Sequence, residues 1–209
     1  MKILIISPPR CGSTSLLNNI SLLRSADRIA EPYTNPKELI SRDPYPYPLP
    51  VTDNCVVKMI TSQVPEEFGK PNEFCKFIKT LYKDYDRTII LGRKNLNEHF
   101  ESFLNLRMRL NKENVHAPWY INELETYNKS LELIDQLKAT LKKNLEMINQ
   151  IQIELNIPII FYEDLYGSDR EKSFNILKNL DLELDVNLLN KKLHPKFKYR
   201  QKELDKPLI

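Results

Sequence analysis

The residues with the clearest chemical potential lie together in the segment SPPRCGSTSLL, at positions 7–17. This segment combines the guanidinium of Arg10 with Gly12 and a run of three hydroxyls. Only 4 of the 209 residues are glycine, so a glycine here indicates that the backbone must approach something closely. Hydroxyl donors, a fixed positive fork and the N–H groups of a following helix form a cradle for a phosphate group, which we expect from Arg10, Gly12, Ser13, Thr14 and Ser15. The alternative is an ordinary helix start, in which Ser13 or Thr14 only caps the helix.

The flanking residues predict a strand before this segment and a helix after it. Residues 2–7 are a mostly apolar run, typical of a strand that is buried on both faces. Leucine and isoleucine then recur at helical spacing through residues 14–23. Strand, tight loop and helix in this order are the opening of an α/β fold. We therefore predict three layers, with a central parallel sheet flanked by helices.

The same alternation continues along the chain. Apolar runs predict further strands at 55–60, 87–92 and 157–165, and helical periodicity predicts helices at 71–85, 95–110 and 169–180, with Asp169 as the N-cap of the last. Residues 43–54 contain four prolines and must be irregular. The chain contains neither an internal repeat nor a clear linker, so we predict one domain over residues 1–209.

One long helix is predicted over residues 117–156, where apolar residues recur at steps of three, four or seven. Two interpretations of this helix remain open. It either covers the core of its own domain or forms a coiled coil that joins two copies of the chain in a homodimer.

The composition is that of a globular protein, with 41% hydrophobic and 28% charged residues. A net charge of +3 is too small to indicate a nucleic-acid partner, although it is compatible with a local anion site. Three cysteines cannot form a closed set of disulfides, which favours a reducing compartment. The apolar N-terminal run is too short for a signal peptide and no window is long enough for a membrane span, so we expect a cytoplasmic protein.

The segment at positions 7–17 can be compared with known phosphate-binding loops. The nucleotide-hydrolase P-loop requires an upstream glycine and a lysine directly after the second glycine, and neither stands here. The segment instead resembles the phosphosulfate-binding loop of sulfotransferases that use 3′-phosphoadenosine 5′-phosphosulfate (PAPS), which reads roughly P-[KR]-[SC]-G-[ST]-[ST]-x-L. Its counterparts in this sequence are Pro9, Arg10, Cys11, Gly12, Ser13, Thr14, Ser15 and Leu16. The resemblance implies that this loop, Cys11 included, binds the 5′-phosphosulfate.

Two further segments resemble this family in the same order along the chain. In the family, a basic residue at a strand end and a serine about two helical turns later bind the 3′-phosphate. IILGRKNLNEHFESF offers Arg93 or Lys94, followed by Ser102. The usual interval of eight fits Lys94, whereas Arg93 is nearer the strand end and has the bidentate geometry that phosphates favour. The segment IIFYEDL resembles the family's late strand, and we interpret residues 162–165 as a structural signature.

The resemblance also suggests which residues do the chemistry. Many members place a histidine after a strand lysine as general base, but here Lys58 is followed by Met59 and Ile60. Lys58 resembles the lysine that steadies the sulfuryl group, with a solvated strand-end lysine as the alternative. Other branches use a glutamate, and RIAEPYTNP resembles the trehalose-type branch. We therefore predict Glu31 as the base, with Lys58 and Arg10 as the other catalytic residues; a solvated loop carboxylate is the alternative for Glu31.

The remaining expectations concern ligands and the alternatives to catalysis. PAPS would be the sulfuryl donor, with no metal, and the acceptor would be a hydroxylated molecule, a carbohydrate or other small molecule being favoured. Lys198 and Arg200 in the basic tail are candidates for folding over the nucleotide, and residues 33–54 and 108–120 for the acceptor site. We expect His99 to be a surface residue. The alternatives are an inactive nucleotide-binding or interaction protein of the same fold and, less favoured, a small-molecule kinase.

Overall fold

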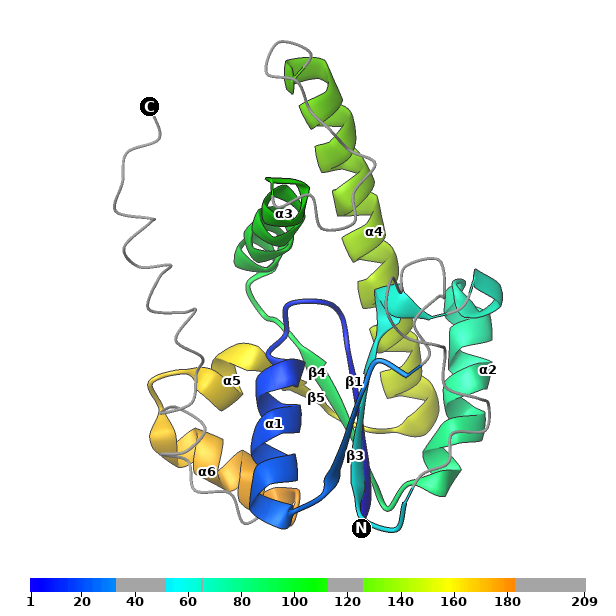
Figure 1. The fold of residues 1–209 in the computed structure, drawn as a ribbon, viewed down its shortest axis with the longest axis vertical. Coiled ribbons are helices and arrows are strands. Elements are labelled where there is room, and N and C mark those ends of the chain that lie inside the picture. Colours follow the sequence, from blue (N-terminus) through cyan, green and yellow to red (C-terminus); the bar gives the residue numbers. More distant parts are fainter. Residues whose placement is uncertain (33–51, 65, 113–125, 183–209) are drawn as a thin grey trace.

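Five parallel strands form the centre of the molecule, in the order β2-β3-β1-β4-β5 (Figure 1). The computed structural model describes residues 1–32, 52–64, 66–112 and 126–182. The strands are β1 (Lys2–Ser7), β2 (Asp27–Ala30), β3 (Cys55–Ile60), β4 (Arg87–Gly92) and β5 (Ile159–Phe161). The predicted α/β fold with a parallel sheet between two layers of helices is confirmed.

The helices of the described residues cover both faces of this sheet. They are α1 (Ser13–Arg24), α2 (Pro71–Leu81), α3 (Leu96–Lys112), α4 (Thr126–Leu155), α5 (Tyr162–Tyr166) and α6 (Arg170–Asn179). Single 3₁₀ turns at Thr61–Gln63, Glu66–Phe68 and Tyr82–Asp84 join some of them. Asp169 caps α6 as predicted, because its carboxylate accepts a hydrogen bond from the Lys172 backbone N–H at 3.0 Å.

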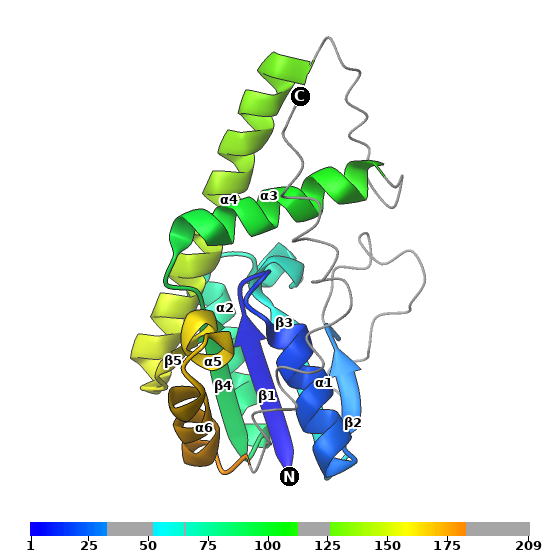
Figure 2. The same ribbon diagram turned by 90° about the vertical axis from the view of Figure 1, so that its left-hand side faces the viewer.

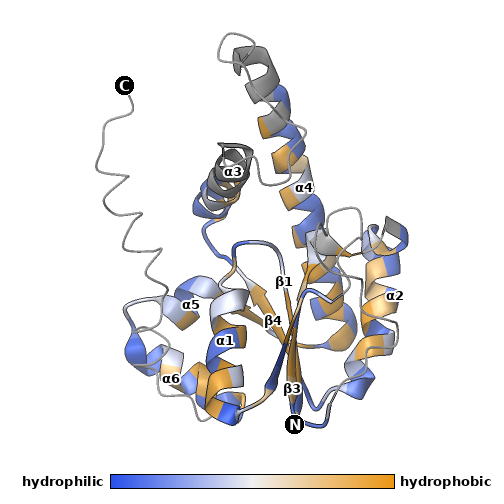
Figure 3. Ribbon diagram, in the orientation of Figure 1, coloured by the Kyte–Doolittle hydropathy of each residue, from blue (hydrophilic) through white to orange (hydrophobic). Residues whose placement is uncertain are grey.

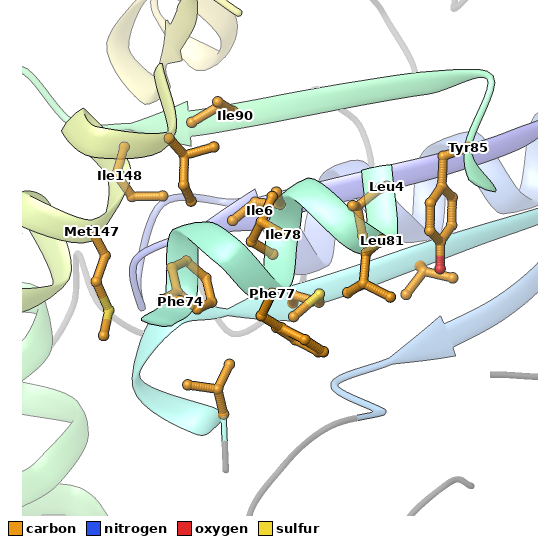
Figure 4. Packing of buried hydrophobic residues seen from close by; sticks show 14 of the residues in the cluster. Leu4, Ile6, Phe74, Phe77, Ile78, Leu81, Tyr85, Ile90, Met147 and Ile148 are labelled. Carbon is orange, nitrogen blue, oxygen red and sulfur yellow. The ribbon is translucent and has the colours of Figure 1, made fainter. Parts of the chain in front are cut away.

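The side chains of β1 alternate between two buried clusters, because successive residues of a strand point to opposite faces. Leu4 and Ile6 pack with α2 and the C-terminal half of α4 (Figure 4). Ile3 and Ile5 pack with α1, α5 and α6 on the other face. Both sets are fully buried, which is why the strand reads as a continuous apolar run. Figure 3 shows these apolar strands between helices that carry both apolar and hydrophilic residues.

The carboxyl ends of the strands meet at one edge of the sheet. Ser7 pairs with Ile60, and Gly92 with Phe161, so the chain leaves β1, β3, β4 and β5 on the same side. In Figure 2, α3 crosses above the carboxyl end of β1. Residues 7–17, 89–103 and 159–165 therefore converge at this edge, where ligands bind in open α/β sheets.

The structure differs from the predicted elements in two places. Strand β2 was not predicted and directly precedes Glu31. The strand predicted over 157–165 is confined to residues 159–161, and residues 162–166 are helical. Residues 117–125 of the predicted long helix lie outside the described part of the chain; helix α4 is described from Thr126 and ends before Asn156, whose φ is 52°, close to the predicted end. Its C-terminal half covers the core of its own sheet, as one of the two interpretations required.

Candidate functional site

The loop between β1 and α1, residues 8–12, has an uncommon backbone conformation. Arg10 has a φ of 69° and Gly12 a φ of 77°, both in the left-handed region. Glycine adopts this conformation readily, whereas for arginine it costs on the order of 1–2 kcal/mol, so the surroundings must hold it. Gly12 is itself the N-cap of α1, and no side-chain hydrogen bond caps this helix in the described residues. The alternative in which Ser13 or Thr14 serves only as a cap is therefore wrong.

Gly12 is also required sterically, because two tyrosines of α5 pack against it. A Cβ atom at this position would lie 2.6 Å from Tyr166 Cε2 and 2.9 Å from Tyr162 Cδ2. The Tyr166 hydroxyl donates to the Gly12 carbonyl at 3.0 Å. The segment that resembles the family's Y-E-D-L signature therefore supports the loop from one side, which agrees with its interpretation as structural.

Lys58 joins the loop to Glu31. Its side chain, on β3, is only 3% exposed, and lysine is rarely so buried unless it is paired. Its Nζ donates to Thr14 Oγ1 at 2.8 Å and forms an ion pair with Glu31 Oε1. Glu31 is placed by the β2–β3 ladder, since its backbone N–H donates to the Lys58 carbonyl at 2.8 Å. Neither residue is the solvated side chain that the alternatives described.

Arg10 reaches across the loop to α3. Its Nε donates to Ser102 Oγ at 3.1 Å, and this contact is partly buried. The two residues were assigned to opposite ends of the donor, Arg10 to the 5′-phosphosulfate and Ser102 to the 3′-phosphate. The structure brings them together at the same edge of the sheet.

His99 is fully buried, so the expectation that it is a surface residue was wrong. Its ring lies beneath the loop, with Nε2 2.7 Å from the Pro9 carbonyl and 3.7 Å from Cys11 Sγ. Burial lowers the pKa of His99, and the nearby charges of Arg93 and Arg10 act in the same direction, against the hydrogen bond to Pro9 and the charge of Glu163. The sequence pattern predicted an exposed side chain because histidine counts as polar. In the structure, His99 lies on the buried face of α3 together with Phe103.

The other residues of the loop differ in what they can offer a ligand. Cys11 is fully buried, and burial raises the pKa of its thiol to about 12, so it stays neutral and can contribute only backbone groups. Ser13 is buried as well, and its Oγ accepts from Ser7 Oγ at 2.9 Å. Thr14 is exposed and is the hydroxyl that contacts Lys58.

The two candidates for the 3′-phosphate have different surroundings. The Arg93 side chain is 10% exposed and lies over the Tyr162 ring, 4.6 Å from its centroid, within 3.6 Å of Glu163 and 3.5 Å of Glu98. Its charge also lowers the pKa of Cys11, against the dominant effect of burial, so it acts on the loop. Lys94 is 47% exposed and forms an ion pair with Asp164 at 2.6 Å.

Several predicted site residues lie outside the described part of the chain. They are Lys198 and Arg200, together with the aromatic residues of the predicted acceptor segments, Tyr45, Tyr47, Trp119 and Tyr120. Most of the two segments predicted to form the acceptor site, 33–54 and 108–120, lies there too. Within the described residues, no group of three or more His, Cys, Asp or Glu is arranged to hold a metal ion. Nor does this part of the chain contain a helix long and apolar enough to cross a membrane.

No family model matches the chain, and no curated protein matches it either. The geometry of the site gathers three cationic side chains, Arg10, Lys58 and Arg93, around a strained loop at the start of a helix. A carboxylate, Glu31, lies directly beside one of these cations. Such an arrangement can bind a multiply charged anion and hold a base next to it.

Proposed function

We propose that the protein is a PAPS-dependent sulfotransferase that sulfates a hydroxyl group. The observation that carries this proposal is the contact of Lys58 with both Thr14 of the anion loop and Glu31. One buried ammonium thereby lies between the predicted donor site and the predicted base. The three sequence segments that resemble the family also converge at this edge, although they lie far apart in the chain.

The residues present fit a nucleotide with two phosphate groups. The left-handed loop and the uncapped start of α1 suit an oxyanion, with Arg10 and the hydroxyl of Thr14 as further donors. Arg93 supplies a second positive fork. Its orientation is set by the contact with the Tyr162 ring and by the ion pairs with Glu98 and Glu163. We assign the 5′ end of the donor to the loop and the 3′-phosphate to Arg93 and Ser102.

The chain's own residues then have distinct roles. PAPS supplies an activated sulfuryl group, whose bond to phosphate breaks as the bond to the acceptor oxygen forms. Glu31 accepts the proton that the acceptor hydroxyl loses. Lys58, Arg10 and the N–H groups at the start of α1 stabilise negative charge on the leaving phosphate. Most of the protein's contribution is positioning and charge stabilisation, so no metal site is needed.

The same ion pair also favours a second candidate, a protein of this fold that binds the nucleotide without turnover. Lys58 engages the Oε1 atom of Glu31, so an acceptor hydroxyl has to approach the carboxylate at its other oxygen. In addition, Met59 and Ile60 stand where many members of the family carry the catalytic histidine. Binding without transfer would select this candidate.

A binding experiment separates these proposals from a kinase. We expect 3′-phosphoadenosine 5′-phosphate (PAP) to raise the melting temperature of the protein and ATP to leave it unchanged, because only PAP carries the 3′-phosphate. A shift by ATP with Mg²⁺ and none by PAP would contradict both the sulfotransferase and the binding-protein proposals. Labelled PAPS with a panel of sugars, lipids and tyrosyl peptides then tests for transfer and identifies the acceptor class.

A further inference from the structure

The contact between His99 and the Pro9 carbonyl identifies a role for a residue that the proposed chemistry does not use. His99 is fully buried on α3, and its Nε2 lies 2.7 Å from the Pro9 oxygen. A carbonyl oxygen can only accept a hydrogen bond, so Nε2 must carry the proton. Within the described residues, Nδ1 has no hydrogen-bond partner, which is tolerable for a lone pair and costly for an N–H group. Both observations assign the neutral ring with its proton on Nε2.

This hydrogen bond acts on the backbone of Arg10. The Pro9 carbonyl and the Arg10 nitrogen belong to one rigid peptide plane, and the rotation of that plane about the Arg10 N–Cα bond is φ. Arg10 has a φ of 69°, a conformation that L-residues other than glycine rarely adopt. Holding the Pro9 oxygen therefore holds Arg10 in the left-handed region against its own preference.

The same face of α3 holds the side chain of Arg10 as well. Ser102 lies three residues after His99, so both project from one side of the helix, and Ser102 Oγ accepts from Arg10 Nε at 3.1 Å. Helix α3 thus holds the loop through two hydrogen bonds, one to the backbone before Arg10 and one to the Arg10 guanidinium. Without the hydrogen bond from His99, Arg10 could relax to a conventional φ, which would move the guanidinium away.

We propose that His99 is a positioning residue for the anion-binding loop, which keeps Arg10 in its left-handed conformation through the Nε2–H···O=C hydrogen bond to Pro9. The choice of ligand in the following tests rests on the proposed function. The positioning itself does not, because it concerns the protein without ligand.

Two substitutions of His99 separate its hydrogen bond from its volume. His99→Gln retains an N–H at the position of Nε2, whereas His99→Phe fills the space and donates nothing. We expect His99→Phe to weaken PAP binding about tenfold, because it removes the hydrogen bond that holds Arg10 in its strained backbone conformation. His99→Gln should bind within about threefold of the wild type. Equal affinity of His99→Phe and the wild type would overturn the proposal.

A double-mutant cycle distinguishes positioning of Arg10 from a general structural role. In an Arg10→Ala background there is no guanidinium to place, so His99→Phe should change PAP affinity by less than about twofold. The same tenfold loss in both backgrounds would mean that His99 only supports the fold. Leu141→Ala is the matched control, because Leu141 is buried between α3 and α4 in a cluster that includes no residue of the loop. It should lower the stability and leave PAP affinity within a few-fold of the wild type.

Nitrogen NMR gives a readout that needs no ligand. The imidazole signals of His99, identified by their loss in His99→Gln, should show Nε2 protonated at neutral pH, and protonation at Nδ1 would overturn the proposal. The Arg10 Nε–H signal should be protected from solvent exchange in the wild type and in His99→Gln, and unprotected in His99→Phe. Unchanged protection in His99→Phe would also overturn it. If the wild type fails to bind PAP, the proposed function is wrong while these two signals still decide the role of His99.

Discussion

Arg10 Nε donates a hydrogen bond to Ser102 Oγ at 3.1 Å, although the two residues lie 92 positions apart. The contact ties the loop after β1 to the helix after β4, and it brings together a residue assigned to each end of the nucleotide. Each of these residues therefore has a partner within the protein itself.

Replacement of Arg10 tests the anion loop. Arg10→Ala should remove a charge-assisted contact of roughly 1.5–3 kcal/mol, so PAP affinity should fall about ten- to a hundredfold in calorimetry. Arg170→Ala makes the same change of charge at an exposed position on α6 and should leave the affinity unchanged. Equal losses in the two variants would show that only the overall charge matters.

Substitution of Gly12 tests the packing of α5 against the loop. Gly12→Ala combines a left-handed φ with a Cβ 2.6 Å from Tyr166 Cε2, so we expect it to lower the free energy of unfolding by about 2–4 kcal/mol. Tyr166→Phe removes only the hydrogen bond to the Gly12 carbonyl and should cost about 1 kcal/mol. Urea unfolding measures both. A Gly12→Ala protein as stable as the wild type would contradict the described loop.

The 3′-phosphate provides a prediction that distinguishes Arg93 from Lys94. Arg93→Ala should weaken binding of PAPS by about tenfold or more and barely affect adenosine 5′-phosphosulfate, which lacks that phosphate. Arg93→Lys should lose nearly as much, because a point charge cannot replace the fork. Lys94→Ala should leave the preference for PAPS intact, because the Lys94 ammonium is a point charge on a side chain that is 47% exposed, whereas Arg93 is a fork that is 10% exposed. Equal penalties of Arg93→Ala on both nucleotides would mean that Arg93 supports the fold rather than the ligand.

The dependence of stability on pH should report on His99. Burial holds the folded pKa of His99 below its usual 6.5, so the unfolded chain takes up a proton that the folded protein does not. The contribution of His99 to the free energy of unfolding should therefore be complete above about pH 6.5. It should decrease as the pH drops from there toward the folded pKa. A second fall is expected below about pH 4.5, because Glu163 and Asp164, whose pKa values are lowered in the folded protein, take up protons more readily in the unfolded chain. Although burial acts to raise the pKa of each carboxyl, the backbone N–H groups of Lys94 and Asn95 hold that of Glu163 low, and Lys172 and Lys94 hold that of Asp164 low.

The His99→Gln variant separates the two falls. It should lose the first and keep the second, as measured by urea unfolding across this pH range. If the stability of His99→Gln decreased by the same amount below pH 6.5, that decrease would have to come from groups other than His99.

The sequence predicts much of the fold, but not the contacts among the candidate site residues. The apolar runs of β1, β3 and β4 identify buried strands with accurate bounds, because burial on both faces leaves no alternation to interpret. Strand β2 is too short and too polar to give such a signal, although its register with β3 is what sets Glu31 beside Lys58. Which residues pair is a tertiary property that no local pattern contains.

His99 and the tyrosines of α5 are further cases in which tertiary contacts, and not the local sequence pattern, decide the structure. A polar residue in a helix predicts exposure, and His99 is buried only because the loop before α1 offers it a carbonyl. Residues 162–166 follow a strand pattern in sequence and become helical against Gly12. The glycine itself was the available signal, since a glycine in a chain with so few of them indicates close packing as well as a turn.

Transfer of labelled sulfuryl from PAPS by the wild type and by Glu31→Gln is the most direct measurement of the proposed reaction. The amide keeps the shape of the carboxylate and cannot accept the proton, so transfer should fall by about 10²–10⁴ while PAP affinity stays within a few-fold. The wild type should transfer label to at least one hydroxylated acceptor of the panel. Transfer by Glu31→Gln within a few-fold of the wild type would place the base elsewhere. Binding of PAP without any transfer by the wild type would contradict the sulfotransferase assignment itself.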